Sequence, residues 1–214
     1  MERLLCIGIG YLCGCLQFAY ILGKLIKGVD IRQYGSGNAG TTNAIRVLGT
    51  KIGIATLALD ILKAVLALVI IALLWGYDQK YLLLWGGVGV VLGHNYPFYM
   101  QFRGGKGVAA TIGIFLAADI RLLLIAGIPA LILLAVTKYM SLASLTYMLL
   151  LVITAAFFYI KEPQGIEVLI LVACLAVSGF WRHRANIKRL VHGQEVKMGQ
   201  KVKIDQKDKE EKSK

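Results

Sequence analysis

The chain has 214 residues, of which 57% are apolar and 17% are charged, and its mean hydropathy is +0.68. Soluble domains are about 45–50% apolar, so this composition excludes an ordinary water-soluble fold and predicts an all-α integral membrane protein. Lys and Arg outnumber Asp and Glu by 24 to 12. In a membrane protein this excess indicates cytoplasmic loops and contact with anionic lipid, so membrane lipid is an expected partner and nucleic acid is not.

Seven apolar segments are candidates for membrane crossings, for which roughly 20 residues are needed. They cover residues 4–25, 52–75, 81–100, 108–118, 122–136, 142–160 and 166–181. Because the segment 108–118 is short, we expect it to tilt, to be partly re-entrant, or to begin in the glycines before it. The alternative, one long helix over 108–136, would place Asp119 and Arg121 near the bilayer centre at a cost of several kcal/mol.

An odd number of crossings collects most basic residues on one side of the membrane. By the positive-inside rule this side is the cytoplasm and the N-terminus lies outside. Four unusual polar segments emerge on the same side, at residues 35–46, 93–107, 138–144 and 181–195. Channels and carriers place polar groups near the midplane, so this one-sided clustering favours an enzyme.

The chain reads as one membrane domain followed by a tail. We expect the domain to cover residues 1–195 and residues 196–214 to form a charged, disordered cytoplasmic tail, because that stretch has almost no apolar content.

The segment 35–46 reads GSGNAGTTNAIR and is an expected anion site. Glycines let several backbone N–H groups turn toward one point, and hydroxyl and amide side chains add donors, which suits a phosphate or a carboxylate. The alternative is a tight interfacial turn whose glycines serve packing.

Three glycines of this segment match the GxGxxG spacing, with Asp60 twenty residues after the last. A dinucleotide fingerprint follows a strand in a βαβ unit, whereas this segment lies between two expected transmembrane helices, so we reject that match. The remaining expectation is a glycine turn feeding a short helix over residues 42–48. Thr42, Asn43 and Arg46 would then share one face of it.

The segment 93–107 ends in GGKG, where Lys106 stands among three glycines. Free backbone N–H groups and an ammonium at a helix start would bind an anion, although the frame of a Walker A loop is absent. The alternative is a flexible turn with an ordinary cytoplasmic lysine. His94 and Asn95 end the preceding helix, and His94 suits a helix-end hydrogen bond as well as a substrate contact.

Asp60 and Lys63 are spaced i, i+3 inside an apolar run. Charges inside the membrane are costly, so the two form either a structural clasp or the floor of a polar site. In the segment 138–144, Ser141 and Ser144 either line a site or cap and pack a helix.

The segment 181–195 places His183 and Asn186 on one face, within a band of basic residues. The default for such a stretch is an amphipathic helix lying on anionic lipid. His183, Asn186 and Glu195 add polar specificity that lipid binding does not require, which favours a place in or beside an active site.

Together these segments resemble the PlsY family of bacterial acyl-phosphate-dependent glycerol-3-phosphate acyltransferases. The resemblance covers residues 1 to about 195 and rests on GSGNAGTTNAIRVLG, GHNYPFYMQFRGGKG, HRANIKRLVHGQE and the Asp60 and Lys63 pair. It implies transfer of a fatty acyl group from acyl phosphate to the 1-hydroxyl of sn-glycerol 3-phosphate, giving lysophosphatidic acid and inorganic phosphate. It also implies phospholipid biosynthesis at the cytoplasmic face of the bacterial inner membrane, and no cofactor or metal is expected.

The site residues that follow from the motifs and the resemblance form two groups. The expected catalytic residues are Ser36, His183 and Asn186. The expected substrate-binding residues are Gly37, Asn38, Gly40, Thr42, Asn43, Arg46, His94, Asn95, Gly104, Gly105, Lys106, Gly107, Ser141 and Glu195. In one departure from the family pattern, Arg103 stands where lysine is common.

Two mechanisms and a rival function stay open on the sequence alone. In the expected mechanism the donor's own phosphate takes the hydroxyl proton; in the competing one Ser36 carries the acyl group or His183 is a general base. The rival function is a membrane carrier for a phosphorylated or anionic solute, which would also use Arg, Lys and glycine turns.

Overall fold

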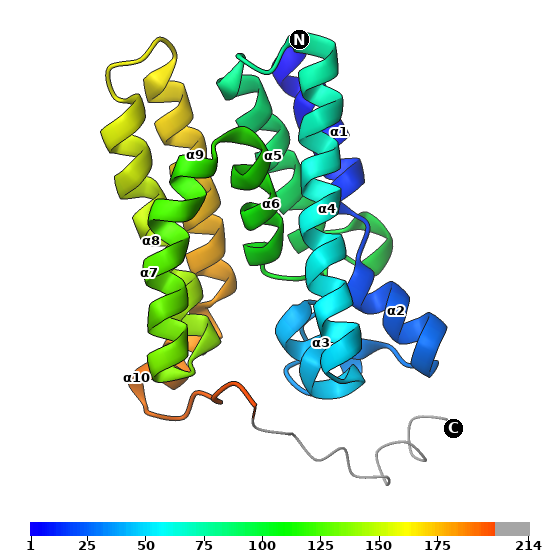
Figure 1. Cartoon of the computed structure of the whole chain (residues 1–214). Coiled ribbons are helices and arrows are strands. Elements are labelled where there is room, and N and C mark those ends of the chain that lie inside the picture. Colours follow the sequence, from blue (N-terminus) through cyan, green and yellow to red (C-terminus); the bar gives the residue numbers. More distant parts are fainter. Residues whose placement is uncertain (200–214) are drawn as a thin grey trace, which may run out of the picture.

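The computed structural model describes residues 1–199, and in this range the chain folds into helices without strands (Figure 1). The predicted all-α class is therefore confirmed. The helices are α1 (Glu2–Gly14), α2 (Phe18–Lys27), η1 (Ile31–Gln33), α3 (Thr41–Leu48), α4 (Thr50–Trp75), α5 (Lys80–Asn95), η2 (Phe98–Met100), α6 (Val108–Ala118), α7 (Ile120–Thr137), α8 (Met140–Tyr159), α9 (Gly165–Arg182) and α10 (Arg184–Val191). Residues 200–214, most of the expected tail, lie outside the described range.

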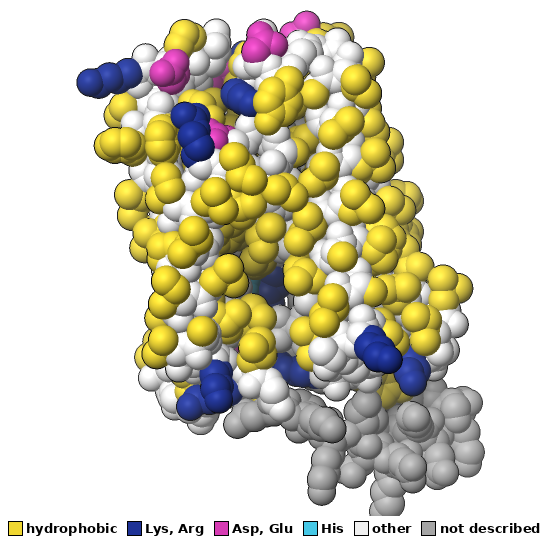
Figure 2. Space-filling model, viewed as in Figure 1, with side chains coloured by type: hydrophobic (Ala, Val, Ile, Leu, Met, Phe, Trp, Pro, Cys, Tyr) yellow, Lys and Arg dark blue, Asp and Glu magenta, His cyan; other side chains and the backbone are white. Residues whose placement is uncertain are grey.

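The bundle has the surface of a multi-pass membrane protein. Five stretches are long and apolar enough to cross a membrane, namely Glu2–Lys27, Thr50–Trp75, Ile120–Thr137, Met140–Tyr159 and Gly165–Arg182. In Figure 2 apolar side chains cover the middle of the molecule, and charged side chains gather mostly toward its two ends. Each of the seven expected segments contains a helix, although α5 and α6 are shorter than a full span. Seven crossings and an external N-terminus stay predictions.

The first expected span, over residues 4–25, is not one continuous helix, because the chain breaks between α1 and α2. Gln17 lies fully buried at the break, and its Nε2 donates to the carbonyl of His94 at 2.9 Å. The Lys63 ammonium donates to the carbonyl of Leu16. Buried backbone groups need partners, and here side chains from other helices supply them. The expectation of an unbroken helix was wrong. The groups that stabilise the break come from distant parts of the chain, so the segment itself does not reveal it.

The third expected span, over residues 81–100, also ends early. α5 stops at Asn95, and after Pro97 the chain forms the 3₁₀ turn η2. Proline disfavours helical geometry in the residue before it, which accounts for the helix end at this position.

α6 covers residues 108–118 as expected, and the long helix over 108–136 does not form. The chain turns at Asp119, where the backbone is extended with φ −159°. The Asp119 carboxylate caps α7 by accepting from the Arg121 amide at 3.0 Å. The Tyr159 hydroxyl donates to the same carboxylate at 2.5 Å, which ties the turn to the end of α8.

α1 and α5 pack backbone against backbone through glycines on both helices. A Cβ on Gly10 would lie 2.0 Å from the carbonyl oxygen of Gly86, and a Cβ on Gly93 would lie 2.2 Å from that of Tyr11. Small residues allow such close approach between membrane helices. Gly86 and Gly93 of α5 therefore serve close packing against α1. This contact fixes the lower end of α5, which carries His94 and Asn95.

We expect Gly10→Ala to lower the stability of the protein by roughly 1–3 kcal/mol, because α1 must move away from α5 to admit the methyl group. The matched control is Gly8→Ala in the same helix, where a Cβ meets nothing within 4 Å. Thermal unfolding of both variants in detergent measures the difference. Equal midpoints for the two would contradict the close contact.

Candidate functional site

Polar side chains from several helices meet at one end of the bundle. Figure 1 shows α3 and α10 at this end, together with the start of α8. The residues whose hydrogen bonds and charges link them here are Arg46, Lys106, Ser141, His183, Asn186 and Glu195. All six are among the residues expected from the sequence.

Glu195 holds this cluster together. Its carboxylate accepts from Asn186 Nδ2 at 2.6 Å, Arg189 Nε at 2.7 Å and Ser141 Oγ at 2.9 Å. Burial alone would raise the pKa of Glu195, but the three hydrogen bonds and the Arg189 charge outweigh it and lower the pKa. The carboxylate therefore stays ionised and anchors α10 to the start of α8. This arrangement fits an anchoring role better than direct contact with a substrate.

Lys106 is the cation at the centre of the site. Its Nζ donates to Asn186 Oδ1. Burial lowers the pKa of Lys106 to about 8, with the Glu195 charge opposing and nearby arginines assisting the shift. The ammonium is therefore mostly charged at neutral pH, but it lacks full hydration and faces a neutral oxygen. A poorly hydrated cation of this kind favours the binding of an anion.

His183 lies buried at the joint between α9 and α10, where its Nδ1 is 2.8 Å from the carbonyl oxygen of Gly179. A carbonyl oxygen only accepts, so Nδ1 carries the proton and Nε2 presents a lone pair. Burial and the Lys106 charge lower the pKa of His183 to about 4. The imidazole is thus neutral at physiological pH. It is suited to accept a hydrogen bond and is a weak base.

The glycines around Lys106 differ from the expected cradle. The N–H groups of Gly104 and Gly105 donate to the carbonyls of Asn95 and His94 at 3.1 and 2.9 Å, so they are not free for an anion. The glycines are needed for space, because a Cβ on Gly105 would lie 2.0 Å from His94 Nε2. Gly107 takes φ +85° and begins α6. The expectation of free backbone donors was wrong for Gly104 and Gly105.

The turn before α3 shows a similar difference. The Ser36 amide donates to Asn43 Oδ1 at 2.9 Å and the Gly37 amide to the carbonyl of Tyr34 at 3.1 Å. Asn43 is buried and holds the turn, so it does not present its side chain beside Thr42. What the turn offers instead is the first turn of α3, with the exposed Ser36 hydroxyl beside it.

Arg46 connects α3 to the rest of the cluster. Its Nη2 donates to the carbonyl of Val196 at 3.3 Å. Burial lowers the pKa of Arg46, and Glu195 opposes this shift. Among the contacts within residues 1–199, none joins Ser36 directly to Lys106 or His183. The two halves of the expected site therefore meet through Arg46.

Two expected substrate residues lie beneath the surface of the site. His94 is 3% exposed and Asn95 is fully buried. Asn95 Nδ2 donates to Ser178 Oγ at 3.1 Å, which ties α5 to α9. His94 contacts Lys63 and the underside of the glycine loop. Both support the site from below.

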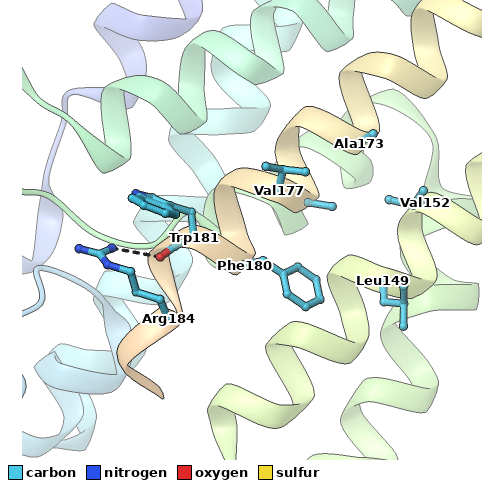
Figure 3. Close-up of a pocket in the computed structure, with 8 residues that line it drawn as sticks. Leu149, Val152, Ala173, Val177, Phe180, Trp181 and Arg184 are labelled. Atoms are coloured by element: carbon cyan, nitrogen blue, oxygen red, sulfur yellow. Dashed lines mark hydrogen bonds between the residues drawn. The ribbon is translucent and has the colours of Figure 1, made fainter. Parts of the chain in front are cut away.

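An apolar hollow of about 330 Å³ opens between α6, α7 and α8. At one end it is lined by Val108, two residues after Lys106, and by Ser144, three residues after Ser141. A second hollow, of about 520 Å³, lies between α8 and α9 on the outer side of the bundle. Figure 3 shows Trp181 and Arg184 at its end, with the other lining residues apolar. Val108 and Ser144 place the first hollow beside the segments that carry Lys106 and Ser141.

Sequence reasoning missed two residues that shape the site. Arg182 donates to the carbonyls of Gly105 and Gly104 at 2.9 and 3.0 Å, and Arg189 pairs with Glu195. Both belong to the basic band that reads as a lipid-facing surface. No signal in the sequence separates them from their basic neighbours, because Arg182 ends α9 and Arg189 belongs to α10, beyond the joint at His183.

Comparison with known proteins gives a consistent result. The sequence profile of glycerol-3-phosphate acyltransferase matches residues 4–193. Relatives with that name include a protein of Shouchella clausii, 45% identical over 198 residues, which are 90% of this chain and 94% of the relative. A relative from Thermoanaerobacter pseudethanolicus is 42% identical over 196 residues, covering 92% of this chain and 96% of its own.

Two crystal structures of PlsY, an integral membrane glycerol 3-phosphate acyltransferase, are similar to this chain. Both are 35% identical to it and cover 93% of this chain and 96% of their own. The TM-score is 0.83 for the glycerol 3-phosphate form and 0.80 for the lysophosphatidic acid form.

We expect Glu195→Gln to destabilise the protein by roughly 1–3 kcal/mol at pH 7, because the amide cannot accept from all three donors. The folded-state pKa of Glu195 lies below its usual 4.5. Its contribution is therefore complete above that value and is lost as the pH falls through the folded-state pKa. Thermal unfolding in detergent should show a gap between wild type and variant that closes in acid. The exposed Glu162→Gln is the control, and a gap independent of pH would contradict the carboxylate's role.

Proposed function

Because the chain belongs to the glycerol-3-phosphate acyltransferase family, we propose that it transfers a fatty acyl group from acyl phosphate to the 1-hydroxyl of sn-glycerol 3-phosphate. The products are lysophosphatidic acid and inorganic phosphate. The chain is a membrane acyltransferase. We further propose that acyl phosphate is the donor and that the site lies at the cytoplasmic face of the bacterial inner membrane.

The observation that carries this proposal is the meeting of a polar cluster with an apolar hollow. Lys106 and Ser141 belong to the cluster, and Val108 and Ser144 line the hollow only a few residues further along the same segments. The reaction needs such a junction, since one substrate is small and anionic and the other carries a lipid chain. We place the acyl chain of the donor in the hollow between α6, α7 and α8.

Lys106 and Arg46 would bind the phosphate of glycerol 3-phosphate. In the structure both cations donate to neutral oxygens, those of Asn186 and Val196. A phosphate dianion makes stronger charge-assisted hydrogen bonds than these oxygens, so it can replace them. The donor's phosphate would lie at the first turn of α3 beside Ser36, where helix N–H groups and the dipole favour an anion.

His183 and Asn186 would orient the attacking hydroxyl. The Nε2 lone pair of His183 can accept the hydroxyl proton in a hydrogen bond, but a pKa of about 4 makes this imidazole a poor general base. A mixed anhydride is already activated, so holding the hydroxyl at the carbonyl supplies much of the catalysis. The proton then passes to the phosphate that leaves.

Turnover by purified protein in detergent tests this proposal against the carrier. Labelled glycerol 3-phosphate is incubated with acyl phosphate, acyl-CoA or acyl carrier protein of the same chain length. We expect lysophosphatidic acid from acyl phosphate, and a loss of at least about 10²-fold in Ser36→Ala, as is typical when a transition-state donor is removed. Uptake of glycerol 3-phosphate by liposomes without turnover in detergent would instead establish a carrier. Trapping of acylated Ser36 would overturn the substrate-assisted mechanism.

The pH profile provides a second test. The pKa of Lys106 is lowered to about 8, so its charge is present below this pH and lost above it. The substrate phosphate is already a dianion there, with its second pKa near 6. We expect kcat/KM for glycerol 3-phosphate to fall as the pH rises through about 8. Lys106→Arg should remove this fall, whereas the exposed Lys161→Arg should keep it. The same alkaline fall in Lys106→Arg would contradict the assignment.

A further inference from the structure

We propose that Asp60, Lys63 and His94 form a positioning triad that fixes the imidazole of His94 under the glycine loop and thereby sets the place of Lys106. The proposal rests on the proposed function and deepens it. It gives a role in acceptor binding to three buried residues, none of which is placed against the substrate.

Lys63 is the centre of the triad. Its ammonium carries three N–H donors and has three acceptors around it: Asp60 Oδ1 at 2.7 Å, His94 Nδ1 at 2.9 Å and the carbonyl of Leu16. The side chains of Lys63 and Asp60 are each only 1% exposed. The ammonium is therefore held by two hydrogen bonds, to Leu16 and His94, and by an ion pair with Asp60.

This geometry selects one tautomer of His94. Since Lys63 donates to Nδ1, that nitrogen holds a lone pair and the proton lies on Nε2. Asp60 Oδ1 lies 3.7 Å from Nδ1, too far for a hydrogen bond. Its negative charge instead stabilises the ammonium that donates to Nδ1. A change at Lys63 therefore alters both the orientation and the proton position of His94.

The imidazole of His94 supports the glycine loop from below. Gly105 lies so close to Nε2 that even a methyl group there would overlap it. The Gly105 amide donates to the backbone carbonyl of His94, and Arg182 donates to the carbonyls of Gly105 and Gly104. His94 and Arg182 thus both hold the loop. Lys106 is the next residue, so its approach to Asn186 depends on this support.

A simple clasp between α4 and α5 does not account for the triad. An ion pair inside a membrane is costly, and apolar residues of similar volume would join the helices equally well or better. The triad also ends on the one loop that carries the central cation of the site. If the triad positions Lys106, its loss should weaken the binding of glycerol 3-phosphate and leave the binding of the acyl donor almost unchanged.

Steady-state kinetics of four variants test this role, after wild-type turnover has been established. We expect Lys63→Met and His94→Leu each to raise KM for glycerol 3-phosphate at least 10-fold, and KM for acyl phosphate less than 2-fold. The double variant should be no worse than the poorer single variant, because Lys63 acts through His94. Thr56→Val is the control, since Thr56 is buried in the same helix and its hydroxyl donates to the carbonyl of Ile52, one turn earlier.

A charge-neutral variant separates positioning from stability. Asp60→Leu combined with Lys63→Met removes both buried charges, so it should fold with an unchanged or higher unfolding temperature in detergent. The proposal requires the same selective rise in KM in this variant. A normal KM here, additive effects in the double variant above, or an equal loss for both substrates would overturn it.

A spectroscopic measurement keeps the proposal testable without turnover. The chain has only three histidines, so ring ¹⁵N signals can be assigned with the His94→Leu variant. We expect His94 to show the Nε2–H tautomer in the wild type and to lose it in Lys63→Met. An Nδ1–H tautomer in the wild type would overturn the triad even if the enzyme turns over. An intact tautomer without turnover would count against the proposed function instead.

Discussion

The close contact between the backbones of α1 and α5 is the constraint on which the site end of the bundle depends. Because glycines leave no side chains between the helices, the end of α1 meets the carbonyls at the end of α5. Gln17 can then donate to the α5 carbonyls of Gly93 and His94, and Lys63 donates to the carbonyl of Leu16 where the chain leaves α1 for α2. The same contact holds His94 where α4 can reach it.

The cations at this end fall into two kinds according to their partners. Lys63 faces the Asp60 carboxylate and is neutralised inside the protein. Lys106 and Arg46 donate instead to amide or backbone oxygens, and only the charge of Glu195, which bonds to neither, opposes theirs. A low local dielectric makes an uncompensated charge costly until an anion arrives. The charges of Lys106 and Arg46 are therefore available to a bound anion, whereas the charge of Lys63 is already paired with Asp60.

Local features of the sequence predicted much of this arrangement. The apolar runs gave the helices, the i, i+3 spacing gave the Asp60 and Lys63 pair, and the glycine turn gave a short helix that starts at Thr41, one residue before the expected 42. Hydrogen-bond partners far apart in the chain could not be foreseen. Gln17 breaks a helix because carbonyls of α5 accept its amide protons, and the amides of Gly104 and Gly105 are taken by the end of the same helix.

The roles of the basic residues at the end of α9 and in α10 could not be predicted from the sequence either. Its residues look alike in sequence, yet Arg182 and Arg189 turn inward to carbonyls and a carboxylate, while Arg184 stays at the outer surface beside Trp181. Which arginine faces the site depends on where α9 ends and α10 begins. That joint is set by His183, whose imidazole bonds back to Gly179.

The shortness of α6 places the loop that carries Lys106 well inside the length of the bundle. Eleven residues make a helix about 16 Å long, roughly half of a hydrocarbon layer of about 30 Å. In Figure 1 both ends of α6 lie short of the ends of α4, so the loop with Lys106 is recessed into the bundle. Under the proposed function the soluble acceptor descends to meet the donor, and the fatty chain never has to leave the bilayer.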